Sequence, residues 1–65
     1  MSDFRARLHE EYVQLQYRIE KLTIFIVSEK YDDLPEIERK ALKSQLLHMQ
    51  SYFDVLSGRV SRLCN

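Results

Sequence analysis

The sequence has very little of the residues that build loops, disulfides or membrane spans. Its 65 residues include one glycine, one proline and one cysteine. The single glycine excludes a glycine-rich loop that cradles phosphate, and the single cysteine, Cys64, excludes a disulfide within the chain. No run of 18 apolar residues occurs, so no membrane span is expected. Ten basic residues balance ten acidic ones, which argues against a general binder of polymeric nucleic acid.

Cysteine usage and the first residues also bear on location. A free thiol is typical of a reducing compartment. Residues 1–5 show no basic segment followed by an apolar stretch, the pattern of a secretory signal. We therefore expect a cytoplasmic protein.

What the sequence does contain is a heptad stripe in each half. Apolar residues recur at alternating spacings of four and three: Leu8, Tyr12, Leu15, Ile19, Leu22 and Ile26, then Leu42, Leu46, Met49, Phe53, Leu56, Val60 and Leu63. Such a repeat keeps every member on one face of a helix. We expect an all-α fold with one helical-hairpin domain over residues 1–65. Its helices, about 3–28 and about 34–63, should pack antiparallel.

Both predicted helices have start signals. Ser2 and Asp3 suit the N-cap of the first helix, because their side-chain oxygens can accept from free backbone N–H groups. Asp33 is predicted to cap the second helix. Glu36 would then occupy the capping-box position and Pro35 the first turn.

A domain this small needs more than its own core. Chains below about 70–80 residues usually depend on disulfides, a metal or a partner. Metal binding has little support, because His9 and His48 lie in different predicted helices without a metal-binding spacing. A second apolar surface predicts a homo-oligomer; it comprises Phe4, Val13, Tyr17, Ile24, Phe25, Val27, Leu47, Tyr52 and Val55.

Gly58 interrupts the second predicted helix. Glycine costs about 1 kcal/mol there relative to alanine. It is either a simple defect in helix propensity or a place where another backbone or a ligand comes close. The sequence alone leaves both explanations open.

The titratable residues do not form a recognisable catalytic site. The acidic pairs Glu10–Glu11 and Asp32–Asp33 are chain neighbours, and neighbouring side chains on a helix point about 100° apart. Paired-carboxylate chemistry needs two groups that converge on one substrate. Neither histidine has a nucleophile or an orienting partner at a recognisable spacing. We expect no catalytic activity, cofactor or metal.

Four segments have a distinctive residue order: Glu11-Tyr12-x-x-Leu15, Ile19-x-Lys21-Leu22-x-x-Phe25-Ile26-x-Ser28, Leu47-x-Met49-x-x-Tyr52 and Leu56-x-x-Arg59-Val60. Over about residues 4–60 the chain resembles the small phage proteins that act as anti-CBASS cyclic-nucleotide sponges. The resemblance implies a compact homo-hexamer without catalytic activity. It would sequester cyclic dinucleotides, and in several members cyclic trinucleotides, between protomers in the host cytoplasm, and so block antiphage signalling.

The resemblance also implies residues for a cyclic dinucleotide pocket. Tyr12 matches an aromatic residue that stacks on a base; alternatively it is an ordinary member of the seam, with its phenol at an interface edge. Val27 stands where the family has a phosphate-pairing lysine, which Lys30 or Lys21 would have to replace. The alternative role of either lysine, and the more common one for such a residue, is that of a solvated surface side chain.

For a cyclic trinucleotide pocket, the resemblance implies a hydroxyl and an arginine. Ser28 and Arg59 match these, with Arg62 one turn further on. Compensation of the helix dipole is the alternative role of Arg59 and Arg62, and Arg62 suits it well. Because Val27 departs from the family pattern, we expect trinucleotide binding to be the better preserved activity.

A second functional hypothesis comes from the residues alone. The chain would be a coiled-coil interaction or adaptor protein, whose second apolar surface docks a protein helix and binds no small molecule. Binding of cyclic nucleotides distinguishes the two hypotheses.

Overall fold

The chain forms two long helices joined by one short helical turn. The computed structural model describes residues 3–63, in which α1 spans Phe4–Ile26, α2 spans Glu29–Asp32 and α3 spans Glu36–Leu63. Since helices are the regular elements of this described part, the all-α prediction is confirmed.

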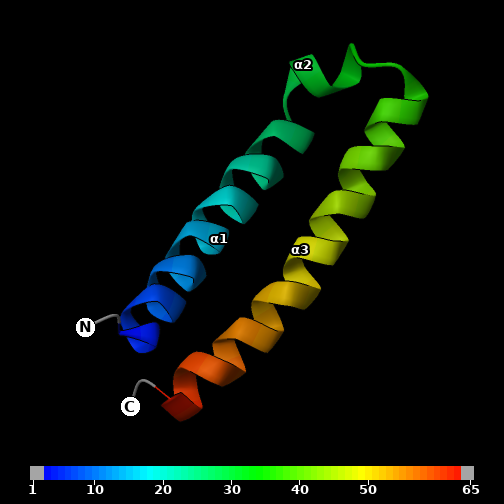
Figure 1. Ribbon diagram of the computed structural model, residues 1–65. Helices are drawn as coiled ribbons and strands as arrows, with labels where there is room; N and C mark the ends of the chain where they lie inside the picture. Colours follow the sequence, from blue (N-terminus) through cyan, green and yellow to red (C-terminus); the bar gives the residue numbers. More distant parts are fainter. Residues whose placement is uncertain (1–2, 64–65) are drawn as a thin grey trace.

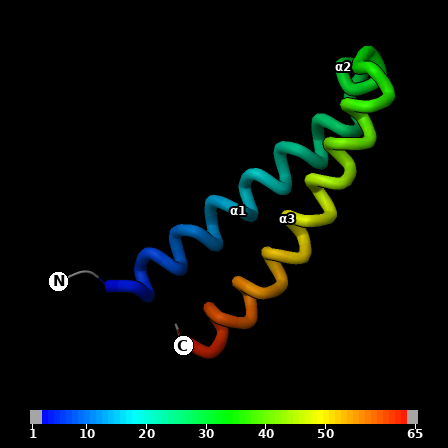
Figure 2. Tube along the Cα trace, turned by 45° about the vertical axis from the view of Figure 1, so that its right-hand side comes forward, coloured from blue at the N-terminus to red at the C-terminus, as the bar shows by residue number. Residues whose placement is uncertain are grey.

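The two long helices lie side by side and run in opposite directions. Figure 1 shows α2 at one end of the pair, with the start of α1 and the end of α3 at the other. Turning the view by 45° leaves α1 and α3 alongside each other (Figure 2). The molecule measures 46 × 17 × 16 Å, so residues at its two ends are far apart within one chain.

The core is the seam between α1 and α3. Leu8 and Leu15 of α1 are 4% and 6% exposed, and Leu56 of α3 is fully buried. Half-buried members of the two heptad stripes surround these leucines: Tyr12, Ile19, Met49, Phe53 and Val60. The heptad spacing thus brings together the apolar faces that form the core.

Local hydrogen bonds explain the limits of α1. Asp3 is the N-cap, as predicted: its Oδ1 accepts from the Arg5 backbone N–H at 3.0 Å. The helix ends at Ile26, a little before the expected end near residue 28. The Phe25 carbonyl accepts there from the backbone N–H and the Oγ of Ser28, at 3.0 and 2.6 Å.

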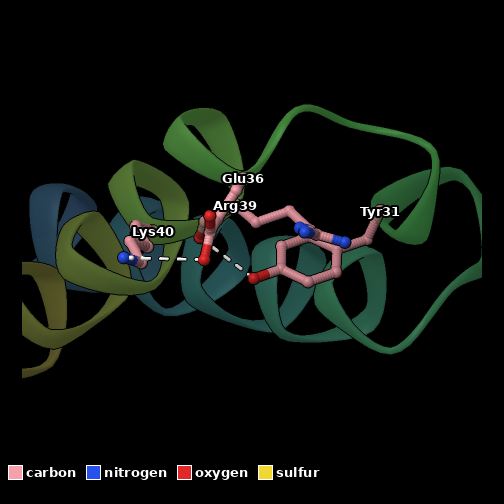
Figure 3. Close-up of polar contacts among 4 residues, drawn as sticks. All are labelled: Tyr31, Glu36, Arg39 and Lys40. Atoms are coloured by element: carbon pink, nitrogen blue, oxygen red, sulfur yellow. Dashed lines mark hydrogen bonds and ion pairs between the residues drawn. The ribbon is translucent and has the colours of Figure 1, made fainter.

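The connection between the long helices contains a helical turn that the heptad pattern did not reveal. Tyr31 anchors this turn and is only 6% exposed. Its ring meets that of Phe25 edge-on, with centroids 6.3 Å apart. Its hydroxyl donates to the Arg39 carbonyl at 2.9 Å, which ties α2 to α3 (Figure 3).

The start of α3 differs from the prediction. The Pro35 carbonyl accepts from the backbone N–H groups of Glu38 and Arg39, both at 3.0 Å. Asp33 instead terminates α2, where its N–H donates to the Glu29 carbonyl at 3.3 Å. The capping role predicted for Asp33 at α3 is therefore wrong, because α3 begins only at Glu36 and Pro35 is the residue before it. The predicted cap Ser2 and the thiol of Cys64 lie outside the described residues.

Truncation of the buried core leucine tests the seam. We expect Leu56→Ala to lower the free energy of unfolding by about 2–5 kcal/mol, since it removes buried methyl groups and leaves a cavity. The exposed control Ser61→Ala should change it by less than about 0.5 kcal/mol. Denaturant titrations at equal protein concentration measure both, and equal stability of the two variants would contradict this description of the core.

Candidate ligand-binding surfaces

A hollow lies at the end of the molecule where α1 begins and α3 ends. It has a volume of about 270 Å³ and is lined by Phe4, Arg7, Leu8, Glu11 and Arg59. The Phe4 ring is 50% exposed, and the Arg5 guanidinium carbon lies 6.0 Å from its centre. Exposed aromatic rings stack on bases, and guanidinium groups bind phosphate through paired hydrogen bonds. We call this feature the terminal hollow.

A hydrogen bond between the two long helices borders the terminal hollow. The Tyr52 hydroxyl of α3 donates to Oε1 of Glu11 on α1. This bond is the main reason that the pKa of Tyr52 is raised; burial and the Glu11 charge also raise it, whereas the Arg59 charge lowers it. The bond links α1 and α3 beside Arg59 and so helps to fix the shape of the hollow.

Tyr12 lies in the seam rather than on an open surface. Its ring stacks on Phe53, with centroids 4.9 Å apart and planes 18° apart, and the His9 ring lies 6.3 Å away. Phe53 therefore covers one face of the Tyr12 ring within the chain. This packing is what we expect if Tyr12 is an ordinary seam residue. A base could reach only the remaining face, and its role in base stacking stays a prediction.

The other residues predicted for a dinucleotide pocket are exposed. Lys21 of α1 places its Nζ 5.0 Å from the centre of the Tyr17 ring, which is a cation–π contact one turn away. Lys30 lies in α2, and Val27 is 81% exposed at the end of α1. An exposed valine cannot pair with phosphate, so a charge would have to come from Lys21 or Lys30.

The residues predicted for a trinucleotide pocket occupy both ends of the molecule. Ser28 lies between α1 and α2, and its hydroxyl hydrogen is engaged by Phe25. Arg59 is exposed and lines the terminal hollow. Arg62 lies in the last turn of α3, and its Nη1 is 3.1 Å from where a Cβ on Gly58 would sit.

The dinucleotide set is spread along α1 and α2, and the trinucleotide set does not converge within one chain. Tyr12 and Lys21 are nine positions apart on α1, about 14 Å at the helical rise of 1.5 Å per residue, and Lys30 lies beyond the end of α1, in α2. Ser28 is the N-cap of α2, whereas Arg59 lies beside Phe4 and Arg7 at the start of α1. The α2 end and the start of α1 are opposite ends of the helix pair (Figure 1). A pocket containing both Ser28 and Arg59 therefore needs residues from more than one copy of the chain.

Several residues of the terminal hollow were not predicted as site residues. Phe4, Arg7 and Glu11 share one face of α1 because they are spaced by three and four, and Tyr52 and Arg59 are one heptad apart on α3. Within each helix, this spacing was a signal in the sequence. The pairing of the two faces was not, because it depends on how the antiparallel helices align.

Two further hollows suit phosphate less well. A groove of about 540 Å³ beside the seam contains no basic side chain; it is lined by Gln16, Ile19, Glu20, Gln50, Phe53 and Asp54. A hollow of about 270 Å³ beside α2 contains Arg39, Lys40 and Lys43. There Lys40 pairs with Glu36 at 3.6 Å (Figure 3). Arg39 donates to the Asp32 carbonyl at 3.5 Å.

Residues 3–63 also bear on metal binding and on membrane insertion. No group of three or more His, Cys, Asp or Glu residues in this part of the chain is arranged to hold a metal ion. None of its helices is both long and apolar enough to cross a membrane.

Comparisons with known proteins cover nearly the whole chain. A family model described as Sequestin matches residues 2–62. An uncharacterised 7.5 kDa protein from the denB–rIIB intergenic region of Enterobacteria phage T4 is 36% identical over 62 residues, which cover 95% of this chain and 97% of that protein. No solved structure is significantly similar. These matches confirm the resemblance to a phage family that the residue order predicted.

Titration of Tyr52 tests the bond beside the terminal hollow. We expect its pKa to lie above the ordinary value and to fall when Glu11→Gln removes the carboxylate charge. The Tyr52–Glu11 bond favours the neutral phenol in the folded state. It therefore stabilises the fold at pH values below the ordinary tyrosine pKa, and this stabilisation is lost as the pH rises through the raised pKa of Tyr52.

The chain has four tyrosines. The difference in phenolate absorbance between the wild type and Tyr52→Phe gives the titration of Tyr52 alone. Glu10→Gln is the matched control, because Glu10 accepts from Gln14 on the same helix. An unchanged Tyr52 titration in Glu11→Gln would contradict the bond.

Proposed function

This chain belongs to the Sequestin family, and from that membership we propose that it binds and sequesters cyclic oligonucleotide second messengers without converting them. The observation that carries the proposal is the family match over residues 2–62. The terminal hollow supports it, because Arg7 and Arg59 offer charge-assisted bonds to phosphate beside the exposed ring of Phe4.

In this proposal the protein is a homo-oligomer that holds its ligands between protomers. The resemblance to the sponge family implies a hexamer. The distance between Ser28 and Arg59 within one chain requires this arrangement for the trinucleotide pocket. Large apolar side chains on the outer faces of α1 and α3 support self-association, since Ile24 is 68% and Ile37 is 77% exposed. Cyclic messengers of the host are small soluble molecules, so we place this activity in the host cytoplasm.

Sequestration requires binding energy and no bond cleavage. Phosphodiester oxygens would accept from the arginines, and a base would stack on an aromatic ring. The protein would lower the free concentration of the messenger in proportion to the number of pockets, and the host effector would stay inactive.

Calorimetry with purified cyclic di- and trinucleotides tests the function. We expect the trinucleotide to bind more tightly, because Val27 removes the phosphate partner of the dinucleotide pocket. Heating the complex should release the nucleotide intact. If neither class binds at micromolar concentrations, the adaptor hypothesis is favoured; recovery of a cleaved nucleotide would contradict the absence of catalysis.

Replacement of Arg59 tests the trinucleotide pocket. We expect Arg59→Ala to weaken trinucleotide binding by about tenfold or more, since a hydrogen bond to a charged group contributes about 1.5–3 kcal/mol. Arg18→Ala, which removes another exposed arginine, is the control. Tyr12→Ala should affect dinucleotide binding instead. Light scattering must show the same oligomer for every variant, and undiminished trinucleotide binding by Arg59→Ala would reject this assignment.

A further inference from the structure

α3 carries a second heptad stripe on the side opposite the core seam. Its members again alternate in spacing between four and three: Ile37, Ala41, Ser44, His48, Ser51, Val55 and Gly58. All are exposed except Gly58, which is half-buried. Four of the seven are alanine, serine or glycine, which allow the backbone of another helix to come close. We call this face the outer stripe.

The outer stripe matches itself when it is read in the opposite direction. We propose that α3 packs antiparallel against α3 of a second copy of this chain, about a twofold axis at His48. Residues at nearly equal distances from His48 then face each other and pair large with small: Ile37 with Gly58, Val55 with Ala41, and Ser44 with Ser51. A twofold interface makes every such contact twice.

The charges that border the outer stripe favour the same alignment. Lys40 lies opposite Asp54 of the second copy, and Glu38 lies opposite Arg59 of the second copy. Leu47, which is 65% exposed, meets its own counterpart beside the axis. Sliding one helix by a heptad in either direction separates both pairs of opposite charge. Such exposed pairs contribute little energy, but they select one alignment over others.

The surroundings of Gly58 fit this arrangement. A Cβ on Gly58 would meet only the flexible guanidinium of Arg62 within the chain, with Nη1 at 3.1 Å. The fold of one copy therefore does not require glycine, although glycine weakens the helix. The side chain of Ile37 from a second copy supplies the reason for a small residue here.

This pairing deepens the proposed function and rests on it, because it names the contact through which the copies associate. Antiparallel α3 helices bring the α2 end of one copy beside the terminal hollow of the other. Ser28 of one copy and Arg59 of the second then lie at the same end of the pair. The two residues predicted for one trinucleotide pocket are thereby brought to the same level, which a single chain does not achieve.

Cysteine crosslinking tests the axis. In a Cys64→Ser background, His48→Cys should form a covalent dimer on mild oxidation, because disulfides need Cα atoms about 4.4–6.8 Å apart and the axis brings the two copies of this position together. Lys43→Cys, exposed on the same helix but outside the stripe, is the matched control. No dimer from His48→Cys, or equal dimer from Lys43→Cys, would overturn the pairing.

A charge exchange provides a second measurement. Lys40→Glu and Asp54→Lys should each weaken association by roughly threefold to tenfold, since each places like charges together twice. The double variant should have an association affinity within about twofold of that of the wild type. If its loss of affinity is instead the product of the two single losses, the pairing is overturned. Oligomers that bind trinucleotide but fail both tests would reject this contact alone, whereas a paired protein that binds no cyclic nucleotide would reject the proposed function alone.

Discussion

The packing of Leu56 against Leu8 and Leu15 is the interaction on which the remaining structure depends. Leu56 is fully buried, and the two leucines of α1 are nearly so. Two helices can cover only one stripe on each other, so this seam cannot grow by adding apolar residues elsewhere. Apolar residues on the outer faces gain nothing from the fold of one copy, and a small core is usually supplemented by association. The geometry of the seam therefore favours the self-association that we propose.

Periodicity made the core predictable and left the connection unpredictable. Every member of the core cluster comes from the two heptad stripes, because a repeat of about 3.5 residues depends only on helical geometry. Tyr31 carries no such signal. Its burial depends on the ring of Phe25 and on the carbonyl of Arg39, which come together only after the chain has turned. Asp33, which the sequence predicts as a cap for α3, instead ends α2 through its backbone N–H.

The candidate site was predictable only in part, because helical periodicity shows the faces of each helix separately. Arg59 was identified through the resemblance, but its neighbours Phe4 and Arg7 come from the opposite end of the chain. Spacing along one helix shows which residues share a face; it does not show which residue of the other helix stands opposite. The alignment that joins Glu11 to Tyr52 also assembles the terminal hollow, and it appears only in three dimensions.

Pairing through α3 would still leave apolar surface uncovered, and this bears on the size of the assembly. A twofold contact is closed, because each outer stripe is used once by each copy. The α1 helices would then lie on the two outer sides of the dimer, where Val13, Tyr17 and Ile24 remain 47%, 58% and 68% exposed. These residues share one face of α1, so a second contact through α1 would join dimers to one another. Two different contacts, one closed and one between dimers, are what an assembly larger than a dimer requires, and three dimers joined in a ring would give the hexamer that the resemblance implies.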